Sequence, residues 1–145
     1  MSRVFVLNGV NLGTLGKRLP EVYGTMTLDD IERLIEDEFP EVDLEFRQTD
    51  SESEMVALIR EAAGSEGLVI NAGAWTHYAY ALHDALEPLD VPKVEVHLSN
   101  VHAREEWRRV SVISPAVDAV IAGMGSYGYI ASVHYILERV PDRRP

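Results

Sequence analysis

The sequence predicts an α/β fold in which helices cover both faces of a five-stranded parallel sheet. Short apolar runs alternate along the chain with stretches that carry apolar residues at helical spacing. This alternation is typical of parallel sheets, because each parallel strand needs a crossover connection and the crossover is usually a helix. No linker, internal repeat or low-complexity segment interrupts the pattern, so we expect residues 1–145 to form a single catalytic domain around one core.

The expected strands are five apolar runs, at residues 4–7, 42–46, 68–70, 94–96 and 117–121. They are short and aliphatic, as in strands that are buried on both faces. The expected helices lie between them and cover residues 29–38, 53–63, 78–86 and 130–139. In the first of these, Ile31, Leu34 and Ile35 share the face that would pack on the sheet. Five strands in 145 residues favour a flavodoxin-like three-layer sandwich, whose ligands bind beyond the carboxyl ends of the strands.

Charge and composition argue against several classes of partner. The net charge is −11 and the isoelectric point is near 4.8. Nucleic acids and anionic membranes are bound through basic residues, so we expect neither as a partner. No apolar run approaches the about 20 residues of a membrane helix, and the N-terminal segment turns polar too soon for a signal peptide. Without cysteine, disulfides and thiolate metal sites are excluded, and we expect a cytoplasmic protein.

Polar residues gather where the expected strands end. They occupy segments 8–13, 71–77 and 95–102, and a basic turn with Arg104, Arg108 and Arg109 follows. A long loop at 14–25 adds Arg18 and Tyr23. Because the carboxyl ends of parallel strands meet at one edge of a sheet, we expect these segments to surround one site.

Each of these residues also has an ordinary structural interpretation. Asn-Gly is a common turn, a histidine at a strand end is more often structural than catalytic, and Arg104 and Arg108 have the spacing of a solvated helix face. The convergence of so many polar types at one edge favours a site. Segment 8–16 lacks the phosphate-binding glycine patterns, and His97 and His102 lack the spacing of a metal site, so we expect neither nucleotide nor metal.

Four segments in order, 8–24, 47–52, 71–77 and 95–108, resemble the type II 3-dehydroquinate dehydratases, and segment 123–129 is a weaker match. The resemblance spans nearly the whole chain. It implies a hydro-lyase that converts 3-dehydroquinate to 3-dehydroshikimate through an enolate, in the shikimate pathway or in quinate breakdown, without a cofactor and without a Schiff base. The chain has two lysines, Lys17 and Lys93, and neither has the sequence context of a desolvated amine tuned for imine chemistry.

The resemblance also implies roles for individual residues. Tyr23 matches the base, and Arg18, with help from Arg104, would lower its pKa. Asn11 matches the residue that holds the enolate. His97 matches the general acid, and Glu95 would orient it or keep it protonated. The substrate-binding positions of the family match Asn71, His77, Asp84, Leu98, Ser99 and Arg108.

In the family, the position of Asp84 reaches the site of a neighbouring subunit, so the resemblance implies a homo-oligomer, a dodecamer built from trimers. Tyr78, Tyr80 and His83 depart from the family pattern, and we interpret the aromatic residues as core or subunit-interface packing. Two alternatives to this interpretation stay open. In the first, the chain is a flavodoxin-like ligand-binding or regulatory module without turnover. In the second, it is an enzyme of the same fold that acts on another hydroxy acid.

Overall fold

The computed structural model describes residues 2–17, 21 and 25–143, with side chains described up to residue 138, and it confirms the predicted fold class. Its sheet consists of β1 (Ser2–Asn8), β2 (Val42–Gln48), β3 (Gly67–Asn71), β4 (Lys93–His97) and β5 (Ala119–Ala122). All neighbouring pairs are parallel, in the order β2-β1-β3-β4-β5. This is the flavodoxin-like strand order. The chain adds β2 on one side of β1 and then β3, β4 and β5 on the other side, and such sheets form their ligand crevice at this switch between β1 and β3.

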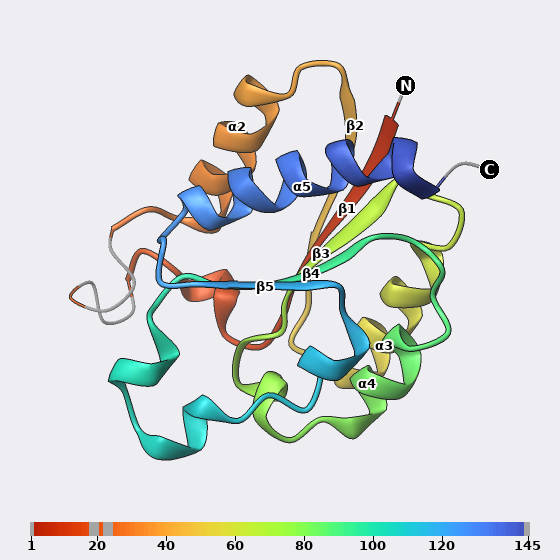
Figure 1. The fold of residues 1–145 in the computed structure, drawn as a ribbon. Helices are drawn as coiled ribbons and strands as arrows, with labels where there is room; N and C mark the ends of the chain where they lie inside the picture. The colour runs from red at the N-terminus through yellow and green to blue at the C-terminus, as the bar shows by residue number, and fades with distance from the viewer. Residues whose placement is uncertain (1, 18–20, 22–24, 144–145) are drawn as a thin grey trace.

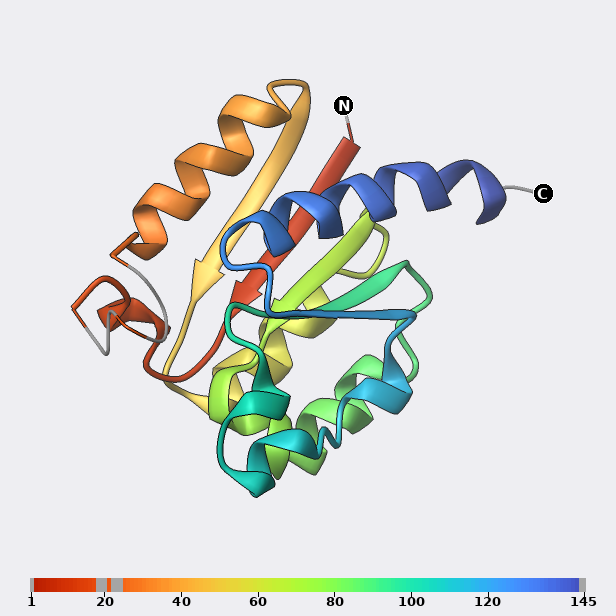
Figure 2. The same ribbon diagram turned by 60° about the vertical axis from the view of Figure 1, so that its left-hand side comes forward.

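In the described part of the chain, helices cover both faces of the sheet (Figures 1 and 2). One layer holds α2 (Leu28–Glu38) and α5 (Tyr127–Arg143), and the other holds α3 (Glu52–Glu61) and α4 (Tyr80–Leu86). Among the described residues, no helix combines the length and the apolar character that a membrane crossing requires. The four helices expected from the sequence are all present, with shifted ends. For example, α4 begins two residues later than predicted and α5 begins three residues earlier.

Short turns of 3-10 helix shape the loops around the sheet. The loops that follow β1, β3 and β4 contain η1 (Leu12–Thr14), η2 (Gly73–His77), η3 (Val101–Ala103) and η4 (Glu106–Arg109), and η5 (Ser114–Ala116) leads into the amino end of β5. The sequence prediction contained none of them, because a single 3-10 turn is too short to show a repeat in the apolar pattern.

The apolar interior is divided by the sheet into two layers, where the sequence predicted one core. Alternate side chains of β1 point to opposite faces, as the pleat of a strand requires. Val4 and Val6 pack with residues of α2 and α5, whereas Phe5 and Leu7 pack with residues of α3 and α4. Both apolar layers extend to the loops at the carboxyl edge of the sheet, so these loops pack on two separate clusters of buried side chains.

Capping residues fix where the helices before and after β2 begin. Thr27 accepts a hydrogen bond from the Asp30 amide at 3.1 Å, and the Asp30 carboxylate accepts one from the Thr27 amide at 2.9 Å. Ser51 caps α3 by accepting from the Glu54 amide. Each pairing satisfies amide groups that have no partner inside the helix, so the loops before α2 and α3 have defined ends.

Candidate active site

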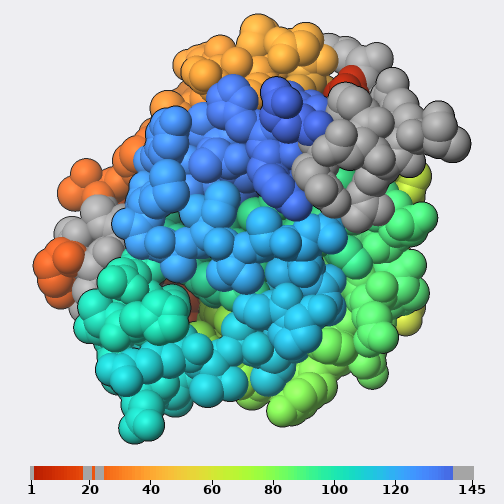
Figure 3. Space-filling model, viewed as in Figure 1, coloured from red at the N-terminus to blue at the C-terminus, as the bar shows by residue number. Residues whose placement is uncertain are grey.

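A cavity opens at the carboxyl edge of the sheet, beside the point where the strand order reverses. Its walls come from the loops after β1, β3 and β4 and from η4. Its empty space amounts to about 540 Å³ when the open solvent at its mouth is included. In the space-filling view, a hollow lies beside the teal segment of η3 and η4, with red atoms of the N-terminal region at its floor (Figure 3).

Most of the residues that the sequence predicted for the site line this cavity. They are Asn11, Asn71, His77, His97, Leu98, Ser99, Arg104 and Arg108. Glu95 lies directly below His97 in the protein interior. Asp84 is exposed on α4 and does not line the cavity of its own chain. Arg18 and Tyr23 lie outside the described residues, so their predicted roles stay predictions.

The loop after β1 is held in a fixed turn. Gly9 lies so close to the loop after β3 that a Cβ atom there would be 2.5 Å from the Ala72 carbonyl oxygen. Asn11 adopts a left-handed backbone conformation with φ of 67°, which asparagine tolerates better than most residues. The Asp50 carboxylate accepts a hydrogen bond from the Asn11 amide at 2.9 Å, and Thr14 donates to the Asn11 carbonyl. The Asn11 side chain is therefore presented to the cavity from a backbone with several restraints.

Asn71, at the end of β3, belongs to a buried chain of hydrogen bonds. Its amide nitrogen donates to the Tyr129 hydroxyl at 2.9 Å, and this hydroxyl donates to the Asn8 side chain at 2.7 Å. The Asn71 side-chain oxygen accepts from the Gly73 amide. Burial raises the pKa of Tyr129 well above its ordinary value, so the phenol stays neutral and keeps both hydrogen bonds. One N–H of the Asn71 amide is outside these contacts and is available to a ligand in the cavity.

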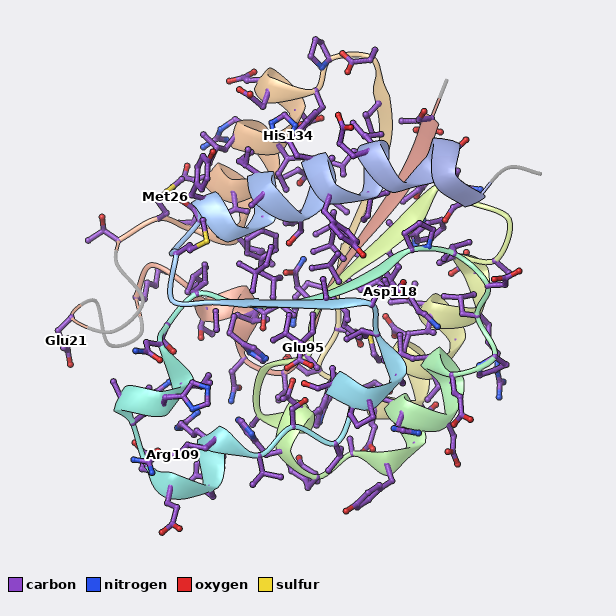
Figure 4. All side chains as sticks on the ribbon, viewed as in Figure 1. Glu21, Met26, Glu95, Arg109, Asp118 and His134 are labelled. Atoms are coloured by element: carbon purple, nitrogen blue, oxygen red, sulfur yellow. The ribbon has the colours of Figure 1, made fainter. Side chains whose placement is uncertain are left out.

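His97 and Glu95 point to the same side of β4 and form a close pair. Nε2 of His97 lies 2.5 Å from the Glu95 carboxylate, and Glu95 is almost completely buried. Figure 4 shows Glu95 pointing from the sheet toward the loop that contains η5. There, the hydroxyls of Ser111 and Ser114 donate to the other carboxylate oxygen at 3.0 and 2.6 Å.

The net effect on Glu95 is a lowered pKa. Burial alone would raise it, but the hydrogen bonds and the charge of His97 and the two serine donors outweigh the burial. Glu95 is therefore ionised at neutral pH, and its engagement with Nε2 leaves Nδ1 as the ring nitrogen of His97 that is open to the cavity. This geometry fits the predicted pairing of the two residues.

His77 is held as a neutral ring. Burial lowers its pKa, and the nearby charges of His97 and Arg108 act in the same direction, against the hydrogen bond to Val110. Nδ1 lies 2.6 Å from the Val110 carbonyl oxygen. Because a carbonyl only accepts, Nδ1 carries the proton and Nε2 is an acceptor. His77 can thus receive a hydrogen bond from a hydroxyl group in the cavity.

Two guanidinium groups give the cavity a basic wall on an acidic protein. Nη1 of Arg104 lies 3.5 Å from the Ser99 hydroxyl. Arg108 donates through Nε to Glu105 at 2.6 Å, and its guanidinium carbon lies 4.2 Å from the ring centre of Trp107. These contacts fix one edge of the Arg108 fork and leave the terminal nitrogens for a two-pronged contact with an anion.

The structure does not support the alternative interpretation of Arg104 and Arg108 as two positions on a solvated helix face. Arg104 lies between η3 and η4, and Arg108 lies inside η4. A continuous helix would place these side chains one turn apart on one face. Two tight turns separated by extended backbone instead direct both residues to the cavity that they line.

The structure corrects the expectation for Lys93 in part. The sequence context of Lys93 does not indicate a desolvated amine, yet Lys93 is 7% exposed and its Nζ donates to the Leu86 carbonyl at 2.8 Å. Lys93 begins β4, however, whereas the cavity lies beyond the opposite end of that strand. Lys17 is exposed and does not line this cavity. Neither lysine is placed to form an imine with a ligand there.

Sequence reasoning missed several supporting residues. Ser111, Ser114, Trp107 and Tyr129 all contact predicted site residues, as does Asp50. The only available signal was that Trp107 and Asp50 lie inside the resembling segments and Tyr129 ends the weaker one. The serines lie in a segment to which no motif had drawn attention.

Comparison with known proteins agrees with this arrangement. The profile of the family described as dehydroquinase class II matches residues 2–137. A 3-dehydroquinate dehydratase of Pelodictyon phaeoclathratiforme is 50% identical over 137 residues, 92% of this chain and 91% of the relative. Its counterpart of the same name in Desulfitobacterium hafniense strain Y51 is 43% identical over 145 residues, 99% and 100% of the two chains.

Solved structures give the same result. The type II dehydroquinase from Propionibacterium acnes superposes with a TM-score of 0.89 at 45% identity, over 94% of this chain and 97% of that one. The type II dehydroquinase from Butyrivibrio crossotus superposes with a TM-score of 0.91 at 37% identity, with the same coverage. On the matched profile and the identity over nearly the full length of both chains, this protein belongs to the dehydroquinase class II family.

Proposed function

We propose that the protein is a 3-dehydroquinate dehydratase that removes water from 3-dehydroquinate to give 3-dehydroshikimate. The observation that carries this proposal is the buried pair of Glu95 and His97 in the wall of the cavity. It offers a proton source to a leaving hydroxyl, and the curated relatives bear the name of this activity.

The basic wall suits the carboxylate of the substrate. The protein carries a net charge of −11, so an anion reaches the site only where cations are concentrated. Arg104 and Arg108 supply that charge in the cavity. The terminal nitrogens of Arg108 bind the carboxylate or a ring hydroxyl of the substrate in a two-pronged contact, while the amide of Asn71, the ring of His77 and the backbone around Leu98 and Ser99 receive the other hydroxyls.

The first chemical step is removal of a proton from the carbon beside the ketone. By its place in the family pattern, Tyr23 is the base, and Arg18 with Arg104 makes the phenol acidic enough to ionise. Bringing a tyrosine pKa from about 10 to about 7 requires about 4 kcal/mol of electrostatic stabilisation. Two guanidinium groups in a site closed to water supply an effect of that size. Asn11 stabilises the enolate with its neutral amide.

The second step is loss of the hydroxyl. The enolate electrons reform the ketone as the carbon–carbon double bond forms and the carbon–oxygen bond breaks. His97 gives its proton to the departing hydroxyl, which leaves as water. The carbon framework is neither oxidised nor reduced overall and no group is transferred, so two proton transfers complete the reaction and we propose that no cofactor takes part.

The exposed face of α4 supports the proposal of a homo-oligomer, a dodecamer built from trimers. Tyr78 and Tyr80 each expose more than half of their surface beside the exposed Asp84. Large exposed aromatic side chains are typical of contact surfaces. In such an assembly Asp84 would reach the cavity of a neighbouring subunit. Light scattering of the purified protein tests this, and a monomeric mass with full activity would refute it.

One assay tests the function. Purified protein is mixed with 3-dehydroquinate, and the ultraviolet absorbance of the conjugated enone product is followed. We expect the absorbance to rise with wild-type protein and not with Tyr23→Phe, which should still fold. Circular dichroism confirms folding of each sample. Folded wild-type protein that produces no absorbance would favour a binding module instead. Borohydride added with the substrate should leave activity intact, and inactivation would indicate an imine route.

A further inference from the structure

The segment between η4 and β5 contacts Glu95, on the side of this residue that faces away from the cavity. Ser111 and Ser114 lie there, 16 and 19 residues after Glu95, and both hydroxyls reach the same oxygen, Oε1. Ser111 also accepts a hydrogen bond from the Ser114 amide at 3.0 Å, so the two serines hold each other in place. The main chain around them is anchored by the buried side chain of Ile113.

The contacts around Glu95 suit an ionised carboxylate. Two serine hydroxyl groups donate to one of its oxygens and Nε2 of His97 lies against the other, and an ionised carboxylate is the form that only accepts. The contacts of 2.5 and 2.6 Å are in the range of charge-assisted hydrogen bonds. Burial by itself favours the neutral form of this carboxylate, and the serine donors add to the contact with His97 in opposing it.

We propose that Ser111 and Ser114 are positioning residues for the proton-donating step, because their hydroxyl groups keep Glu95 ionised against Nε2 of His97 and thereby keep the imidazole charged. This inference deepens the proposed dehydratase function and rests on it. When the serine donors are removed, the shared proton moves from the imidazole to the carboxylate. His97 then faces the cavity as a neutral ring that has no acidic proton to give to a leaving hydroxyl.

The other ionisable groups around this pair do not compensate for the serines. Among the described residues, His77, Arg104 and Arg108 line the same cavity. His77 is neutral, because burial lowers its pKa. The two arginines are cations beside His97, and positive charge disfavours a second cation. Glu95 is the negatively charged group in contact with His97, so the serines that hold this carboxylate act on the imidazole through it.

The decisive measurement is the protonation state of His97 in the resting protein. Protein labelled with ¹⁵N-histidine is examined by nuclear magnetic resonance at neutral pH, and His97→Gln identifies the signals. In the wild type we expect both ring nitrogens of His97 to carry protons. In Ser111→Ala/Ser114→Ala we expect the nitrogen shifts of a neutral ring. Ser114→Thr, which keeps a hydroxyl, should retain the charged ring. Unchanged nitrogen shifts in the double alanine variant would overturn the inference.

Kinetics provide the second readout. Because a positioned general acid contributes about a hundredfold or more to a rate, we expect kcat to fall roughly tenfold in each single alanine variant and further in the double variant. The KM should stay within about twofold, since neither serine lines the cavity. The single variants provide the test if the double variant does not fold. Failure of the dehydratase proposal would appear as wild-type protein without product, whereas failure of this inference would appear as an active enzyme with unaltered His97 signals.

Discussion

Removing one hydroxyl from the interior, by Tyr129→Phe, tests how the cavity floor is held together. The Tyr129 hydroxyl is the middle member of the chain between Asn71 and Asn8, at 2.9 and 2.7 Å. Phenylalanine fills the same space but leaves an amide donor and an amide acceptor, both buried, without these partners. A stranded polar group costs at least about 1 kcal/mol and commonly about 2 kcal/mol, so we expect the two together to lower the unfolding free energy by about 2–4 kcal/mol.

This loss is large enough to measure in two ways. At about 2–4 °C for each kcal/mol in a chain of this size, the melting temperature should fall by roughly 5–15 °C. Urea unfolding should show a lower midpoint with an unchanged slope. If the proposed function holds, KM should also rise, because the Asn71 amide loses the contact that fixes its orientation.

The matched control lies on the same helix. Tyr127 is 59% exposed, and Tyr127→Phe removes the same hydroxyl from a site in contact with solvent. Surface changes of this kind shift stability by about 0.5 kcal/mol or less. If Tyr129→Phe unfolded at the same urea concentration as this control and bound substrate equally well, the buried chain would contribute nothing to the site and the reasoning would be refuted.

Three further outcomes are expected. Gly9→Ala should destabilise the protein by about 1–3 kcal/mol, because its Cβ would meet a backbone carbonyl at 2.5 Å; a wild-type urea midpoint would show that the loop yields freely. Trp107→Ala should raise KM about threefold with kcat preserved, since it removes the ring under Arg108, a contact of about 0.5–1 kcal/mol; steady-state kinetics with an unchanged KM would contradict this. Because the folded-state pKa of His77 is lowered by burial, its stabilising contribution is complete above about pH 6.5 and is lost as pH falls through the folded pKa. The difference in unfolding free energy between wild type and His77→Gln should therefore shrink toward pH 5, and a difference that stays constant in urea titrations would argue against a buried neutral ring.

Much of the site follows from regularities of parallel sheets. The ends of β1, β3 and β4 meet at one edge, so Asn11, Asn71 and His97 could be placed around one cavity from their position after apolar runs. The pairing of Glu95 with His97 was equally accessible, because residues two apart on a strand share a face.

The remainder depends on contacts that sequence spacing does not encode. Tyr129 bonds to a residue 121 positions earlier, and its partner is chosen by how α5 lies across the sheet. Ser111 lies in irregular backbone and Ser114 begins the single turn η5, and neither segment is long enough for a period to predict the direction of a side chain. The segment at 101–109 places Arg104 and Arg108 at helical spacing but folds as two short turns, with extended backbone at Arg104 between them. Residue spacing alone does not predict this break, because local preference is only a weak guide to structure.

The division of the apolar interior by the sheet has a consequence for mutation far from the cavity. Leu12 and Leu98 at the cavity are rooted in the layer of α2 and α5, whereas Val10 is rooted in the layer of α3 and α4. The two layers form separate clusters of buried residues, so we expect a change in one layer to shift its own wall of the cavity more than the opposite wall. A substitution can therefore affect the site although it lies far from the reacting groups. We expect the loss of a methyl group beneath either helix pair to change the distance between the opposing walls of the cavity, and to change substrate affinity at a destabilisation too small to unfold the protein.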